Sequence, residues 1–298
     1  MVSRRTFLLG TVGTAILGAA GAFAAVEENV IPGRHLLARV TGACDVDATP
    51  QAGPTGNLTS GRFVSAARQR EVGWSLATPP GAIPADHLPV VLVLHGRGVD
   101  HTTAFTRLLL HEFLAQHVRG GGTPFALAAV DGGDAYWHPR ANGDNPMRML
   151  TTEFLPVLQK LGLRTDRIGV LGWSMGGYGA LLLGRESHRG SLPGGVTVVA
   201  AAAGSPALFA SFRSSAAGAF DNQADFERFG QLSAAPDIGA LPLHVSCGSD
   251  DAFAAQTRVF RAHVASVPAG GITRGCHTDG YWRSLAVEQL AFLGSHLG

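Results

Sequence analysis

Ser174 stands in a pattern in which a serine can act as a nucleophile. The segment Gly172-Trp173-Ser174-Met175-Gly176 fits G-x-S-x-G, follows a short apolar run and precedes residues of helical character. A strand, a tight turn and a helix in this order form a nucleophile elbow, which exposes the serine hydroxyl at the carboxyl end of the strand. The alternative is a glycine-rich turn with an incidental serine, because the five-residue pattern also arises by chance.

Asp251 and His277 are the residues that we predict to activate this serine. A serine hydroxyl is a weak nucleophile, so it needs a base within hydrogen-bond reach and an acid that orients the base. Asp251 follows a buried apolar strand, and we prefer it to Asp250; the alternative is that one of the two caps the next helix and neither is catalytic. His277 follows a short strand and precedes the last helix. Its rivals are His138 and His101, in loops at the same edge of the sheet.

Two backbone N–H groups are predicted to complete the site. An oxyanion formed during acyl transfer requires donors that are already in place. One donor is the N–H of Met175, directly after the serine, and the other is that of Arg97 in the loop His95-Gly96-Arg97-Gly98. We expect His95 to be a structural turn residue rather than a catalyst.

The segment 131–144 is rich in glycine and aspartate and carries aromatic residues. Tyr136 and Trp137, together with Trp173 of the serine motif, are predicted to line an acyl or aromatic pocket, and core packing is the alternative. The aspartates here could suggest a cation site, but a polar glycine-rich loop explains them better. We therefore expect neither a metal nor another cofactor.

Strands alternate with helices along most of the chain. Continuous apolar runs, such as that at 90–94, are typical of strands buried on both faces of a parallel sheet. Alternating strands and helices form crossover units, so we predict an α/β fold with a mostly parallel central sheet and helices on both faces. The predicted elements are a hairpin at 61–78, strands at 90–94, 125–130, 168–171, 196–201, 241–246 and 272–273, and helices at 31–39, 103–118, 147–161, 177–183, 252–266 and 281–296.

The longest insertion between these elements is residues 204–236. It is notable for its phenylalanines, which are Phe209, Phe212, Phe220, Phe226 and Phe229. We predict a partly helical lid or pocket wall, and ordinary packing under a loop is the alternative.

The first residues have the features of an export signal. A twin arginine, Arg4-Arg5, precedes a Gly/Ala-rich apolar stretch and the cleavage motif Ala22-Phe23-Ala24. A single membrane anchor is the alternative, because about 20 apolar residues can just span a bilayer. We predict a Tat-type signal peptide at 1–25, a lead-in segment at 26–60 and one domain at 61–298. The protein is then secreted or held in the cell envelope.

Charge and cysteine content exclude some classes of function. The net charge of +1 gives no broad electrostatic attraction to nucleic acid. The three cysteines include no C-x-x-C pair, which argues against zinc or thioredoxin-like chemistry. Outside the cytoplasm one disulfide is permitted. Cys247 and Cys276 lie near the ends of strands that we expect to be neighbours, so they could pair and leave Cys44 free; two buried free thiols are the alternative.

These motifs together resemble the α/β-hydrolase superfamily. The segments that carry the resemblance are His95-Gly96-Arg97-Gly98, the G-x-S-x-G motif, Gly248-x-x-Asp251 and Gly275-x-His277. Residues 131–138 and 153–156 make the chain similar to the esterase group that includes esterase D and the antigen 85 mycolyltransferases. The resemblance covers about residues 61–296, without a match for 26–60 or 204–236.

The resemblance implies a Ser174 acyl-enzyme that water resolves, and therefore ester hydrolysis. With the export signal at the N-terminus, we predict an exported serine esterase. Its substrate would be a carboxylic ester of a small molecule, a lipid or a glycan. Two alternatives stay open, because this fold hosts many chemistries. An acyltransferase would pass the acyl group to an alcohol of an envelope lipid or glycan. A non-catalytic binding protein would keep only the scaffold, although the intact Ser–Asp–His set argues against it.

Overall fold

Eight strands form the central sheet of this computed structural model, which describes residues 42–82 and 87–298. The signal peptide expected at 1–25 and the helix expected at 31–39 lie outside these residues. The strand order is β1-β2-β4-β3-β5-β6-β7-β8. The strands are β1 Leu58–Ser65, β2 Arg70–Ala77, β3 Pro89–Leu94, β4 Ala126–Val130, β5 Arg164–Trp173, β6 Thr197–Gly204, β7 Leu243–Gly248 and β8 Ile272–Thr273.

The sheet is mostly parallel. β1 and β2 form the antiparallel hairpin that the sequence predicted, and β2 pairs antiparallel with β4. All other neighbours, from β4 through β3 to β8, are parallel. The predicted α/β fold with a mostly parallel sheet is therefore confirmed.

Side chains of the central strands alternate between two hydrophobic cores. On β3, Val90 and Leu92 point to one core, whereas Val91 and Val93 point to the other. Because both faces are covered, the strand reads as an unbroken apolar run rather than as an alternating pattern.

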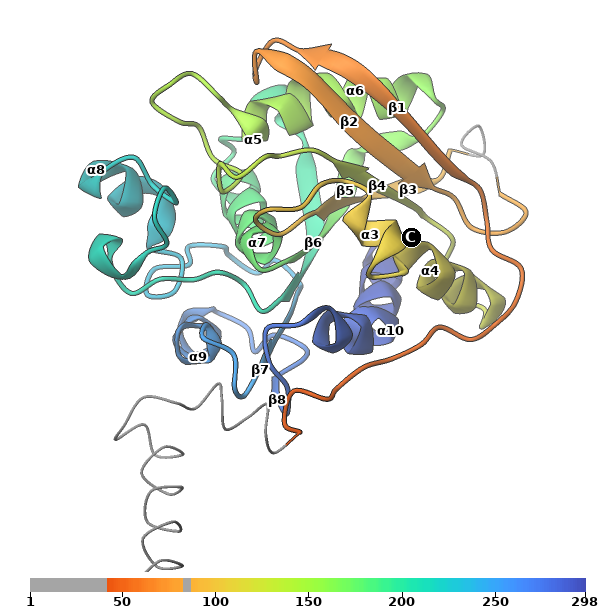
Figure 1. Cartoon of the computed structure of the whole chain (residues 1–298). Coiled ribbons are helices and arrows are strands. Elements are labelled where there is room, and N and C mark those ends of the chain that lie inside the picture. Colours follow the sequence, from red (N-terminus) through yellow and green to blue (C-terminus); the bar gives the residue numbers. More distant parts are fainter. Residues whose placement is uncertain (1–41, 83–86) are drawn as a thin grey trace, which may run out of the picture.

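Helices cover both faces of the sheet (Figure 1). Apolar side chains of α3, α4 and α10 pack on one face, and those of α6, α7 and α9 pack on the other. The helices are α3 Thr103–Thr106, α4 Leu110–Arg119, α5 Pro146–Met149, α6 Leu155–Lys160, α7 Met175–His188, α8 Gln223–Asp225, α9 Ala254–His263 and α10 Asp279–His296. Among the described residues, no helix combines the length and apolarity that crossing a membrane requires.

Two predicted helices are interrupted. The helix expected at 103–118 breaks into α3 and α4, and Leu109 between them has a φ of +54°. The helix expected at 147–161 contains a π-helical turn, Leu150–Phe154, between α5 and α6. Pro156 follows this turn and has no N–H to donate, so a regular hydrogen-bond ladder cannot continue through it.

The insertion 204–236 is a packed layer of short helical turns. Four of its phenylalanines join the larger core, and these are Phe209, Phe220, Phe226 and Phe229. They surround Tyr136, His138 and Tyr178 with ring contacts. The insertion thus packs on the larger core, and its role as a lid or pocket wall stays a prediction.

The cysteine pairing differs from the one considered above. Cys44 and Cys276 form the disulfide, and Cys247 is a buried free thiol. Cys247 lies within β7, paired with Ile272 of β8, so it is fully enclosed by the sheet. Cys276 lies in the loop beyond β8, where the segment 42–57 reaches it from outside. Disulfides persist in oxidising compartments, so this bond is typical of an exported protein.

Candidate active site

Ser174 lies at a sharp turn between β5 and α7. Its φ of +55° and ψ of −121° are disfavoured for a residue with a side chain. Its N–H donates to the carbonyl oxygen of Gly204, and its own carbonyl oxygen accepts from Tyr178 and Ala207. These bonds to a neighbouring strand and to the following helix hold the strained backbone in place.

The glycines of the motif allow the strand and the helix to pack closely. A Cβ atom on Gly172 would lie 2.1 Å from the carbonyl oxygen of Gly176, far inside van der Waals contact. A Cβ atom on Gly96, in the loop after β3, would lie 3.5 Å from the Cβ atom of Ser174. That loop therefore passes directly beside the serine.

The structure brings together the three residues that the sequence predicted. The Nε2 atom of His277 lies 2.9 Å from the Oγ atom of Ser174. The Nδ1 atom of His277 lies 2.8 Å from the Oδ2 atom of Asp251. Because a carboxylate only accepts, Nδ1 carries the proton, and Nε2 is left to accept from the serine hydroxyl.

Aromatic rings fix the orientation of the histidine. Phe253 and Trp282 each meet the His277 ring edge to face, with centroid distances of 5.4 and 4.9 Å. The Asp251 side chain has no exposed surface, and its Oδ1 atom accepts the N–H of Phe253. The acid is therefore held by a backbone donor as well as by the histidine.

The rival residues lie elsewhere. The Oδ2 atom of Asp250 accepts from the hydroxyl of Ser249 rather than from His277. His138 is enclosed between the rings of Phe220 and Phe229. The Nδ1 atom of His101 lies 2.7 Å from the hydroxyl of Ser75 on β2.

His95 holds the loop after β3. Its Nε2 atom accepts the N–H of Gly132, so its Nδ1 atom donates to the carbonyl oxygen of Gly96. Burial lowers the pKa of His95, which agrees with a neutral ring. These bonds join the loop after β3 to the loop after β4. His95 therefore has the structural role that we expected for it.

Solved structures with a similar backbone are numerous. A ferulic acid esterase is 20% identical, and the match covers 81% of this chain and 99% of that one, with a TM-score of 0.67. An S-formylglutathione hydrolase from Agrobacterium tumefaciens is 15% identical, and the match covers 84% of this chain and 99% of that one, with a TM-score of 0.64. A ferulic acid esterase from Anaeromyces mucronatus, in complex with ferulic acid, is also 15% identical; the match covers 85% of this chain and 95% of that one, with a TM-score of 0.64. Neither a protein-family model nor a curated protein matches the chain.

The chain has the α/β-hydrolase fold. Its structural neighbours are S-formylglutathione hydrolases and ferulic acid esterases, as the resemblance to the esterase D group predicted. At these identities the likeness concerns the fold, so the chemistry has to be argued from the site itself.

The two residues predicted to donate N–H groups to an oxyanion, Met175 and Arg97, lie next to Ser174 in the chain and in the wall of its pocket, respectively. Met175 is the first residue of α7, so its N–H has no acceptor within the helix. Arg97 lines the same pocket as Ser174 and His277. The helix dipole adds a positive potential at this point.

A pocket of about 470 Å³ opens at Ser174, within the range of small-molecule sites. Trp173 lines it, as predicted. Tyr136 and Trp137 do not belong to its wall, because both are buried in the larger core. The lining residues are Gly96, Arg97, Val99, Thr103, Arg107, Trp173, Ser174, His277, Thr278, Asp279 and Trp282.

Sequence reasoning missed Trp282 and Arg107 in this wall. Trp282 lies in the first turns of α10, only five residues after His277 in the sequence. This short spacing was the signal that could have placed it beside the histidine. Arg107 lies at the unexpected break after α3 and pairs with Asp279 at 2.7 Å.

The aspartates of the segment 131–144 form hydrogen bonds and an ion pair with other residues of the protein. Asp131 accepts the N–H groups of Gly73 and His101, and Asp134 accepts that of Gly98. Asp144 forms an ion pair with the buried Arg68. In the described part of the chain, no group of three or more His, Cys, Asp or Glu side chains is arranged to hold a metal ion.

Proposed function

We propose that this protein is a serine esterase that hydrolyses carboxylic esters through an acyl-enzyme on Ser174. The continuous hydrogen-bonded chain from Ser174 through His277 to the buried Asp251 carries the proposal. The structural neighbours named as esterases support it.

The first half-reaction forms the acyl-enzyme. The Nε2 atom of His277 takes the proton of Ser174 as Oγ attacks the ester carbonyl carbon. The N–H groups of Met175 and Arg97 stabilise the oxyanion of the tetrahedral intermediate. The intermediate collapses, and the imidazolium gives its proton to the departing alcohol oxygen.

The second half-reaction releases the acid. His277 takes a proton from water, and the resulting nucleophile attacks the acyl carbonyl carbon. The second tetrahedral intermediate then expels Ser174, which recovers its proton from His277. Asp251 remains ionised throughout and stabilises the imidazolium.

The pocket points to esters of small molecules. Trp173 and Trp282 supply an apolar wall beside the serine, while Thr103, Thr278 and Arg107 supply polar groups. One neighbour, the Anaeromyces mucronatus enzyme, contains ferulic acid. We infer that this chain takes a small carboxylic ester in the same region.

Turnover of p-nitrophenyl acetate and butyrate tests the reaction. We expect Ser174→Ala and His277→Ala each to remove nearly all turnover, because the first removes the nucleophile and the second removes the base that activates it. A fluorophosphonate probe should label the wild-type protein at Ser174 and leave Ser174→Ala unlabelled. A folded wild-type protein that takes no label would contradict the proposal.

We further propose export through the Tat pathway, with the signal at residues 1–25 removed. The twin arginine and the cleavage motif support this, and the disulfide suits an oxidising compartment. Sequencing the N-terminus of the protein recovered outside the cytoplasm tests it. A mature protein that still begins at Met1 would contradict cleavage.

A further inference from the structure

The loop that carries His277 is weakly held by the sheet. β8, which precedes it, has only two residues, and in the described part of the chain it pairs only with β7. Within the loop, Gly275 accepts one backbone hydrogen bond from Asp250, and Cys276 accepts one from Thr278. Ser174, by contrast, follows a ten-residue strand that is paired on both sides.

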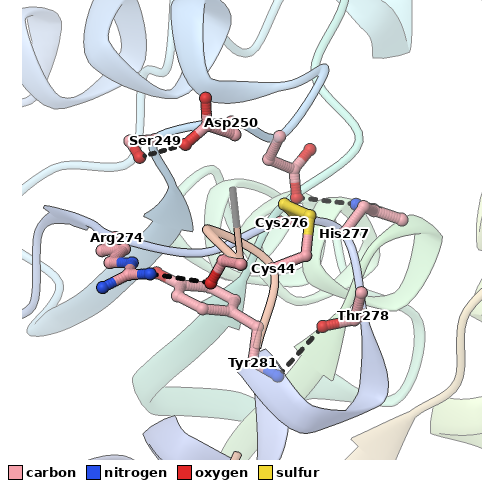
Figure 2. The surroundings of a disulfide bond; sticks show 10 residues. Cys44, Ser249, Asp250, Arg274, Cys276, His277, Thr278 and Tyr281 are labelled. Carbon is pink, nitrogen blue, oxygen red and sulfur yellow. Dashed lines mark hydrogen bonds and ion pairs between the residues drawn. A yellow bond between two sulfur atoms is a disulfide. The ribbon is translucent and has the colours of Figure 1, made fainter. Parts of the chain in front are cut away.

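A segment from far upstream compensates for this. We call residues 42–57 the strap; they run along the outside of the domain from β8 towards β1 (Figure 1). The strap is bonded covalently to Cys276, the residue directly before His277, through Cys44. Figure 2 shows this disulfide beside His277 and the Arg274 side chain reaching the strap. That side chain donates to the carbonyl oxygen of Gly42 at 2.7 Å.

The strap is also fixed to the helix that follows the loop. Asp47 binds Arg283 of α10 through two hydrogen bonds of 2.7 Å each. The backbone of the strap lies so close to α10 that a Cβ atom on Gly280 would meet the carbonyl oxygen of Val46 at 2.4 Å. The strap therefore connects the loop before His277 with the start of the helix after it.

We propose that the Cys44–Cys276 disulfide positions His277, so that Ser174 is fully activated only in the oxidised protein. This inference rests on the proposed esterase function. The bond forms when two thiols react with a disulfide oxidant, R–S–S–R, to give Cys44–S–S–Cys276 and two R–SH. An exported chain then gains its full activity after it reaches an oxidising compartment.

The third cysteine does not compete for this bond. Cys247 is enclosed in β7, and burial raises the pKa of its thiol to about 12. Only a thiolate takes part in disulfide exchange, so Cys247 stays unreactive in the folded protein. It therefore provides a matched control.

The experiment compares kcat and KM for p-nitrophenyl acetate in the oxidised and reduced wild-type protein. Dithiothreitol reduces the disulfide and becomes a cyclic disulfide itself, and it is removed without air before the assay. We expect reduction to lower kcat by about tenfold or more, because small displacements of a catalytic group cost that much or more. KM should change less than kcat, because the part of the pocket wall formed by Gly96, Arg97 and Val99 lies outside the segment that the strap holds. Oxidised glutathione should restore kcat.

Two variants separate this effect from others. Cys44→Ala should have the kcat of the reduced wild-type protein, dithiothreitol should not lower that value further, and oxidised glutathione should not restore it to the wild-type value. Cys247→Ala should behave like the wild-type protein in both redox states.

Each other outcome has a definite meaning. Reduced wild-type protein with an undiminished kcat would overturn the positioning role. A loss of kcat that only parallels a loss of near-ultraviolet circular dichroism would also overturn it, because the disulfide would then act on folding alone. If the oxidised protein neither turns over the ester nor reacts with a fluorophosphonate, the proposed function itself fails.

Discussion

At the scale of single residues, Asp251 determines which nitrogen of His277 faces the serine. One carboxylate oxygen accepts the Nδ1–H of His277, and the other accepts the N–H of Phe253. The side chain has no contact with solvent, so water does not weaken these bonds. The lone pair of Nε2 is thereby directed at the Oγ atom of Ser174.

We predict that Asp251→Asn lowers kcat for p-nitrophenyl esters by about 10⁴-fold, the size of the effect in a serine-protease triad. The shape of the side chain is preserved. An amide NH₂ facing Nδ1, however, would favour the tautomer that carries its proton on Nε2. Steady-state kinetics at neutral pH measure the loss, and circular dichroism checks that the variant is folded.

Asp250→Asn is the matched control. It makes the same chemical change one position earlier, where the carboxylate accepts from Ser249. We expect its turnover to stay near that of the wild type. The acid would have to be reassigned if Asp250→Asn lost as much activity as Asp251→Asn.

At the scale of elements, the elbow depends on backbone contact between β5, α7 and β3. A Cβ atom on Gly176 would lie 1.8 Å from the carbonyl oxygen of Leu94. Neither backbone can move without displacing the sheet or the helix. We therefore predict that Gly176→Ala lowers the free energy of unfolding by about 3 kcal/mol, at the upper end for overpacked sites. Urea denaturation followed by circular dichroism measures this change.

Gly271→Ala provides the comparison for this substitution. A Cβ atom there would have no atom within 4 Å, and the residue precedes β8 in the same domain. Its urea midpoint should stay close to that of the wild type. Equal midpoints for Gly176→Ala and Gly271→Ala would show that the elbow tolerates a side chain.

The sequence predicted elements best where the signal was local. The apolar run at 90–94 and the G-x-S-x-G turn each contain their own explanation, and the structure places a strand and an elbow there. The break at Leu109, where φ is positive, and the π-helical turn before Pro156 interrupt apolar patterns that continue along the chain. From periodicity alone, we therefore predicted one helix where the structure has α3 and α4, and one where it has α5 and α6.

The sequence predicted the three residues at the centre of the site, but not all the residues that line the pocket around them. Ser174, Asp251 and His277 follow strands whose carboxyl ends meet at one edge, so topology alone brings them together. Trp282 lines the pocket from the first turns of α10, and its spacing from His277 was a signal that the prediction did not use. The Cys44–Cys276 bond joins residues 232 positions apart, and only the path of the strap reveals that they meet.

At the scale of the whole molecule, buried histidines couple stability to pH. Burial lowers the pKa of His95 below the ordinary value near 6.5, and its Nε2 atom accepts a hydrogen bond that a protonated ring could not accept. Burial lowers the pKa of His111, His117 and His244 as well. Below about pH 6.5 the unfolded chain therefore binds more protons than the folded one.

We predict that the free energy of unfolding falls as the pH drops from about 7.5 to about 5.5, because it decreases wherever the unfolded state binds the extra protons. Each such histidine contributes at most about 1.4 kcal/mol per pH unit. Carboxylates with a lowered pKa, such as Asp47 and Asp221, add to this loss only below about pH 4, the ordinary range of an aspartate. Urea denaturation at several pH values gives the slope.

His95→Gln isolates one part of this slope. Its amide oxygen can still accept the N–H of Gly132, but the side chain does not titrate. Stability of this variant should depend less steeply on pH between about 6.5 and 5.5 than that of the wild type, since one buried proton acceptor has been removed. An unchanged slope would mean that His95 takes up no proton on unfolding, and a flat wild-type profile would contradict the coupling altogether.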